Sequence, residues 1–286
     1  MCSSSRYRHL RADVLPLLAD GTLMTKGQLK ATRWLYAEAI VEVGRRRSDV
    51  VLLNADVAKS MGTTEFAKTF PDREFNFGIA EQNMMAAAAG MATTGLVPFV
   101  STYAVFASMR ALDQVRNSIC YPNLNVKIAA SHSGITPGPD GVTHQGQEDL
   151  SLMRPLPNMT IVAAADPLTT KMAVHAAADW VGPVYLSFTR DPVPLLYDES
   201  YPFAIGRAVT VRLGNDATIV ANRDMVAQAL LAAEMLAADG LDVRVIDCHT
   251  LKPLDADAIL TAARETGAIV TAEDNAIYGG LGSAVA

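Results

Sequence analysis

The chain has 286 residues, a formal net charge of −6 and 50% hydrophobic residues. Acidic and basic residues are interspersed without a long basic run, which excludes an ordinary nucleic-acid-binding surface. No apolar run is long enough to span a bilayer, and three widely spaced cysteines without a Cys-x-x-Cys pair argue against a disulfide framework or a zinc site. Because the N-terminus also lacks an apolar signal core, we expect a cytoplasmic protein without a membrane segment.

Strands and helices alternate along the first two thirds of the chain. After an N-terminal arm over residues 1–24, the expected elements are a helix over 28–46, a strand over 50–54, a helix over 81–94, a strand over 97–101, a helix over 103–120, strands over 126–131 and 160–164, a helix over 168–180 and a strand over 184–188. This order predicts a mostly parallel sheet that helices cover on both faces.

The alternation is interrupted at Asp191-Pro192-Val193-Pro194 and then resumes. The second series consists of strands over 218–221, 243–247 and 268–272 and helices over 225–238 and 255–265. We therefore predict an α/β fold with two three-layer α/β/α domains, over residues 25–192 and 207–286, joined by a linker over 193–206. A glycine cluster at 279–283 normally opens a helix, so the second domain is expected to be incomplete at its end.

The segment 75–83 predicts a strand end, a turn at Gly78 and a helix start at Glu81. Ligands usually bind at such strand-to-helix junctions, and a carboxylate there can take part in proton transfer. The alternative for Glu81 is a residue of the first helical turn that complements the helix dipole.

Two further segments carry candidate site residues. Tyr103, Phe106 and Met109 are spaced so that they share one face of the expected helix. His132 and His144 lie in a long polar loop after a strand, where side chains often serve function. A metal site at these histidines lacks a third ligand at the usual spacing, so no metal ligands are predicted.

Several motifs occur in an order that resembles a known family. They are Phe77-Gly78-Ile79-Ala80-Glu81-Gln82-Asn83, Ser101-Thr102-Tyr103-Ala104-Val105-Phe106, Asp140-Gly141-Val142-Thr143-His144-Gln145 and His249-Thr250-Leu251-Lys252-Pro253-Leu254. Together they resemble the pyrimidine-binding and C-terminal domains of the thiamine-diphosphate enzymes of the transketolase family. The resemblance covers nearly everything after the N-terminal arm.

The resemblance implies a role for each candidate residue. Glu81 would hydrogen-bond N1′ of the cofactor's aminopyrimidine and so promote removal of the proton from thiazolium C2. The remaining roles would be packing around the aminopyrimidine ring (Tyr103, Phe106, Met109), donor orientation or proton relay (His144), contact with a sugar hydroxyl (Asp140) and binding of the substrate's terminal phosphate (Arg33, Ser60, His132, Arg190).

The family's diphosphate-binding domain has a Gly-Asp-Gly motif and a downstream Asn that hold Mg²⁺ and the diphosphate, and the chain has no Gly-Asp-Gly. The resemblance therefore implies the C-terminal subunit of a split transketolase, a transferase of ketol groups. Its N-terminal partner would carry the diphosphate site in a heterotetramer.

Other functions stay open at this point. The segment 110–115 slightly favours a 1-deoxyxylulose-5-phosphate synthase type, and the beta subunit of a 2-oxoacid dehydrogenase has the same two domains. A non-catalytic assembly subunit is the alternative outside enzymes. One departure from the family is Ala221-Asn222-Arg223-Asp224, where relatives often have Ala-Thr-Gly-Ser.

Overall fold

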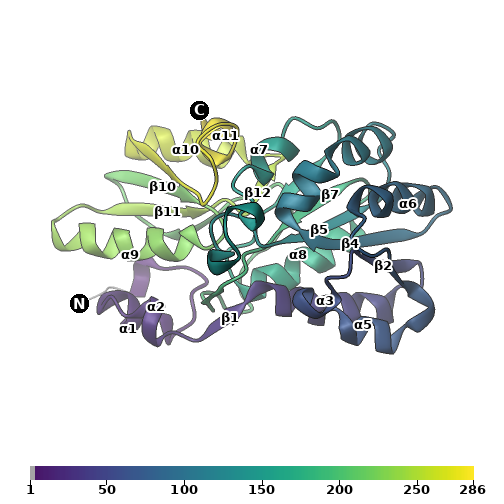
Figure 1. Ribbon diagram of the computed structural model, residues 1–286. Coiled ribbons are helices and arrows are strands. Elements are labelled where there is room, and N and C mark those ends of the chain that lie inside the picture. Colours follow the sequence, from purple (N-terminus) through teal and green to yellow (C-terminus); the bar gives the residue numbers. More distant parts are fainter. Residues whose placement is uncertain (1–3) are drawn as a thin grey trace.

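The computed structural model describes residues 4–286 and contains two α/β domains side by side, the first on the right of Figure 1 and the second on the left. The first domain is built on a seven-stranded sheet in the order β12-β6-β7-β5-β4-β2-β3, in which only the edge strand β12 is antiparallel. These strands are β2 (Val50–Asn54), β3 (Glu74–Asn76), β4 (Val97–Tyr103), β5 (Lys127–Ser131), β6 (Thr160–Val162), β7 (Val184–Ser187) and β12 (Thr250–Lys252).

Helices cover both faces of this sheet. The main helices on one face are α3 (Thr32–Arg46), α5 (Thr64–Thr69) and α8 (Pro167–Asp179), and α6 (Glu81–Thr93) covers the other. Short helices α4 (Ala58–Met61) and α7 (Asp149–Met153) lie in the connections. Val50 and Leu52 pack on the first face, and Val51 and Leu53 pack on the second. The apolar run of β2 is therefore continuous because both of its sides are buried.

The second domain has a four-stranded sheet in the order β13-β10-β11-β9, with β9 antiparallel. Its elements are β9 (Val209–Arg212), β10 (Ala217–Ala221), β11 (Val243–Asp247), β13 (Ile269–Ala272), α9 (Met225–Ala238), α10 (Ala256–Thr266) and α11 (Leu281–Val285). Helix α9 and the N-terminal helices α1 (Val14–Ala19) and α2 (Leu23–Lys26) pack on one face, and α10 and α11 pack on the other. The prediction of two three-layer α/β domains is confirmed.

Two predicted helices differ from the structure at their starts. The helix expected from residue 28 begins at Thr32, because β1 (Leu29–Ala31) pairs with β8 (Pro192–Pro194). The helix expected over 103–120 is wrong in kind, because β4 continues through Tyr103 and two π-helical segments follow, Phe106–Arg110 and Gln114–Cys120. In the described part of the chain, no helix has the length and apolar character needed to cross a membrane.

Arg223 joins the two domains from the turn after β10. Its Nη1 atom lies 3.2 Å from Ser187 Oγ and 3.7 Å from Asp149 Oδ1, both in the first domain. Its Nη2 atom donates to the Asp274 carbonyl at 2.6 Å. The Arg223 side chain is 1% exposed and that of Asp149 is 0% exposed, so this ion pair is shielded from water. Its backbone has a φ of 49°, the left-handed region that the family's glycine would adopt without strain.

The Asp274 carboxylate adds a contact between the second domain and the loop of the first domain that carries His132 and His144. It accepts hydrogen bonds from the Ile135 amide at 3.0 and 3.2 Å. The Ala276 amide also donates to the Gln147 carbonyl at 2.8 Å, at the other end of the loop. The second domain therefore holds the loop that carries the candidate histidines.

Candidate active site

Most of the predicted site residues lie at the carboxyl ends of neighbouring parallel strands. Tyr103 ends β4, His132 directly follows β5, and Arg190 comes shortly after β7. These strands are adjacent in the sheet, so the residues meet at the end of the sheet where the strands have their carboxyl ends. Open α/β sheets bind their ligands at the carboxyl ends of their strands.

Aromatic rings from three separate segments gather here. The Tyr103 ring stacks on His132, with centroids 3.9 Å apart, and on Phe106, with centroids 5.7 Å apart. The His144 ring meets Phe106 edge-on at 5.4 Å. The Tyr103 hydroxyl donates to Ser60 Oγ at 2.8 Å, which brings α4 to the same place. A wall of flat rings suits contact with a planar heterocycle.

Cationic side chains lie beside these rings. Arg33 Nη1 donates to the Arg190 carbonyl, and Arg190 Nε lies 3.4 Å from Asp140 Oδ2. Burial, followed by the charge of Arg190, lowers the pKa of Arg33, and its buried Nε has no hydrogen-bond partner in the described chain. Two arginines near one another with a spare donor form a site that attracts an anion.

His132 stacks on Tyr103, and the positive charges of Arg33 and Arg190 act on its imidazole. Burial, followed by the positive charges of Arg33 and Arg190, lowers the pKa of His132 to about 4. The imidazole is therefore neutral near pH 7, where it can donate or accept one hydrogen bond at each ring nitrogen without adding charge.

This pKa leads to a testable pH dependence of stability. An unfolded histidine binds a proton below about pH 6.5, whereas folded His132 stays neutral down to about pH 4. The unfolded state therefore binds more protons in this window, and the protein loses stability as the pH falls from about 6.5 to about 4. At about 1.4 kcal/mol per pH unit, this loss is at most about 3.5 kcal/mol.

His132→Asn should remove the loss, because asparagine does not titrate and tolerates the left-handed backbone at this position, where φ is 64°. Urea unfolding of both proteins between pH 4 and pH 7 measures the difference. Groups such as Asp247, whose pKa burial raises to about 7, are common to both proteins and cancel. Parallel stability curves would contradict the prediction.

Glu81 is the first residue of α6 and is 2% exposed. Its two carboxylate oxygens accept hydrogen bonds from Arg110 Nη1 at 2.9 and 3.0 Å. The Arg110 guanidinium also lies over the Phe106 ring, 4.2 Å from its centroid. The sequence assigned Arg110 no role in the site, because nothing in its spacing indicates contact with a glutamate 29 positions earlier.

The shared face expected for Tyr103, Phe106 and Met109 is wrong. Tyr103 belongs to a strand, and the π-helical winding of Phe106–Arg110 changes the α-helical spacing on which the expectation rested. Tyr103 and Phe106 still stack, but the Met109 side chain is 40% exposed. Its contact with a cofactor stays a prediction.

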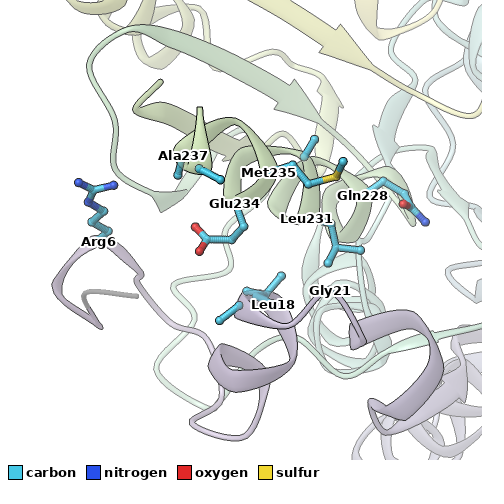
Figure 2. Close-up of a pocket in the computed structure, with 11 residues that line it drawn as sticks. Arg6, Leu18, Gly21, Gln228, Leu231, Glu234, Met235 and Ala237 are labelled. Atoms are coloured by element: carbon cyan, nitrogen blue, oxygen red, sulfur yellow. The ribbon is translucent and has the colours of Figure 1, made fainter. Parts of the chain in front are cut away.

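A separate groove of about 920 Å³ lies between the N-terminal arm and α9. Figure 2 shows Leu18 and Gly21 of the arm opposite Leu231 and Met235 of α9. None of the candidate site residues lines it. Among the described residues, no three His, Cys, Asp or Glu side chains come together to hold a metal ion.

Comparisons with known proteins identify the family of both domains. Residues 28–194 match the family model described as the pyrimidine-binding domain of transketolase, and residues 206–286 match that of the transketolase C-terminal domain. The chain is 42% identical, over 91% of its length and 82% of the relative's, to a putative transketolase C-terminal section of Methanocaldococcus jannaschii.

Two more proteins are similar over most of this chain and over most of their own length. A 6-deoxy-6-sulfo-D-fructose transketolase subunit of Clostridium sp. strain MSTE9 is 41% identical over 88% of this chain and 80% of its own. A solved structure described as a split gene transketolase, inactive beta4 tetramer, superposes with a TM-score of 0.83 at 50% identity, covering 89% of this chain and 83% of that chain. The chain therefore belongs to the transketolase family, whose members depend on thiamine diphosphate.

Proposed function

We propose that this chain is the C-terminal subunit of a split transketolase that moves a two-carbon ketol unit from a ketose phosphate to an aldose phosphate. The observation that carries the proposal is buried Glu81, which is connected through Arg110 to the ring of Phe106 at the ligand-binding edge of the sheet. Subunit relatives that span most of this chain support the same conclusion.

The residues fit the aminopyrimidine half of thiamine diphosphate. A carboxylate and an aromatic face are the groups that a flat, basic heterocycle requires, and both already engage a planar cation, the Arg110 guanidinium. When bound, the cofactor supplies the carbanion stabilisation that ketol transfer needs. Glu81 would hold or share the proton at N1′, and Tyr103, Phe106 and Met109 would orient the ring.

The cationic group would bind the substrate. Arg33 and Arg190 would pair with a terminal phosphate, and His132 and Ser60 would complete the contact through neutral hydrogen bonds. Asp140, next to Arg190, would accept from a sugar hydroxyl. His144, edge-on to Phe106, would orient the donor's hydroxyl or exchange its proton.

A partner chain would hold the diphosphate and Mg²⁺, as expected from the missing Gly-Asp-Gly. Exposed apolar side chains on both domains support such a partner: Ile79 is 77% exposed, Val142 80% and Tyr278 80%. Surfaces of this kind usually bind other proteins. We propose a heterotetramer of two copies of each chain, since closed symmetric assemblies are the rule.

The test combines this chain with a candidate partner that contains Gly-Asp-Gly and a downstream Asn. The two-chain complex should transfer ketol units from a ketose phosphate to an aldose phosphate when thiamine diphosphate and Mg²⁺ are present, and either chain alone should be inactive. Turnover by this chain alone would refute the split arrangement. Turnover that requires pyruvate as the donor would instead identify a decarboxylating enzyme.

A further inference from the structure

Arg110 contacts two of the residues to which the proposed function gives the aminopyrimidine. Its Nη1 atom hydrogen-bonds both oxygens of Glu81, and its guanidinium carbon lies 4.2 Å from the centre of the Phe106 ring. A guanidinium is flat, carries N–H donors at its edge and stacks on aromatic faces. An aminopyrimidine with a proton at N1′ presents the same features to the same two residues.

We infer that Arg110 occupies the place of the aminopyrimidine in the cofactor-free chain and must withdraw before the cofactor can bind. This inference rests on the proposed function, because it takes Glu81 and Phe106 as the cofactor's contacts. Arg110 already contacts both carboxylate oxygens of Glu81 and covers one face of the Phe106 ring, so an aminopyrimidine that uses these groups has to displace it. Arg110 is therefore an internal competitor of the cofactor.

The two ends of the ion pair differ in mobility. The Glu81 side chain is 2% exposed, whereas that of Arg110 is 46% exposed. The hydrogen bonds of the Arg110 side chain within the described chain both go to Glu81. Arg110 also ends the first π-helical segment, an irregular winding of the kind that often occurs at functional sites. Withdrawal therefore requires a rotation of the Arg110 side chain and leaves Glu81 where it is.

The pairing also explains how the chain tolerates Glu81 without a cofactor. A buried carboxylate without a partner is strongly destabilising. Arg110 provides a counter-ion until the cofactor replaces it, so the free chain stays folded at the expense of cofactor affinity.

The experiment measures thiamine diphosphate binding by isothermal titration calorimetry in the two-chain complex with Mg²⁺. The variants are Arg110→Gln, which removes charge and stacking, and Arg110→Lys, which keeps a charge for Glu81 but loses the flat stacking surface. Arg116→Gln is the matched control, because Arg116 lies on the next π-helical segment, Gln114–Cys120, and hydrogen-bonds its neighbour Asn117 instead of Glu81. Gel filtration and thermal unfolding establish that each variant is folded.

Loss of a half-exposed ion pair and a cation–π contact predicts that Arg110→Gln lowers the dissociation constant about tenfold. Arg110→Lys should have an intermediate effect, and Arg116→Gln should have none. Unchanged or weaker binding in folded Arg110→Gln would overturn the inference while the proposed function stands. Absence of cofactor binding in the wild-type complex and in all variants would overturn both.

Discussion

Glu81→Gln should reduce ketol transfer by the two-chain complex about 10³-fold while leaving the protein folded. Glutamine keeps the size of the side chain and can still hydrogen-bond the cofactor, but it cannot hold or release the proton at N1′. Positioned proton transfer contributes about 10²–10⁴-fold to enzymatic rates. Steady-state kinetics with a ketose phosphate and an aldose phosphate measure the loss, which should fall on kcat.

The matched control is Glu65→Gln. Glu65 is also a glutamate in the first turn of a helix, α5, but its side chain is 64% exposed and pairs with Lys68. If Glu81 only complemented a helix dipole, the two variants would behave alike and both would keep near-normal turnover. Such a result would remove Glu81 from the mechanism.

Arg223→Ala should lower the free energy of unfolding by about 3–5 kcal/mol. The substitution leaves Asp149 buried without its cationic partner and removes the contacts from Arg223 to Ser187 and to the Asp274 carbonyl. Urea unfolding of the complete chain, followed by circular dichroism, measures this loss.

Arg223→Gly distinguishes the effect of losing the ion pair from the effect of backbone strain. It loses the same charge, but glycine adopts the left-handed backbone at φ 49° without strain and should be about 1 kcal/mol less destabilising than alanine. Arg46→Ala is the exposed control: Arg46 pairs with Asp179 where both side chains are about half exposed, and its loss should change stability by at most about 1 kcal/mol. Equal effects at positions 46 and 223 would show that the buried ion pair adds nothing.

The sequence predicts well those strands and helices whose pattern of apolar residues matches the faces that they bury. The strand 50–54 and the helix 225–238 occur at the expected bounds, because strands buried on both sides and helices against a sheet have continuous or periodic apolar residues. The π-helical winding after Tyr103 could not be predicted, since one extra residue per turn leaves no mark in apolar spacing. The rings of Tyr103, Phe106, His132 and His144 nevertheless contact one another in the fold.

Contacts between residues far apart in the sequence could not be predicted either. Arg110 pairs with Glu81 and Arg223 with Asp149 only because the fold brings distant segments together. The substitution at position 223 is visible as a departure from the family, but its ion pair depends on a buried aspartate in the other domain. The roles of individual site residues stay predictions, because the sequence indicates only which residue types follow which strands and not which groups they contact.

Strand β12 has a consequence for where this polypeptide can be divided. It lies in the second half of the chain but pairs with β6 of the first domain, and Lys252 Nζ donates to the carbonyls of Arg154 and Leu156. A fragment that stopped near residue 206 would leave β6 as an open edge, which invites pairing with other chains. A break of the polypeptide between its two domains would therefore cut a sheet to which both halves of the chain contribute.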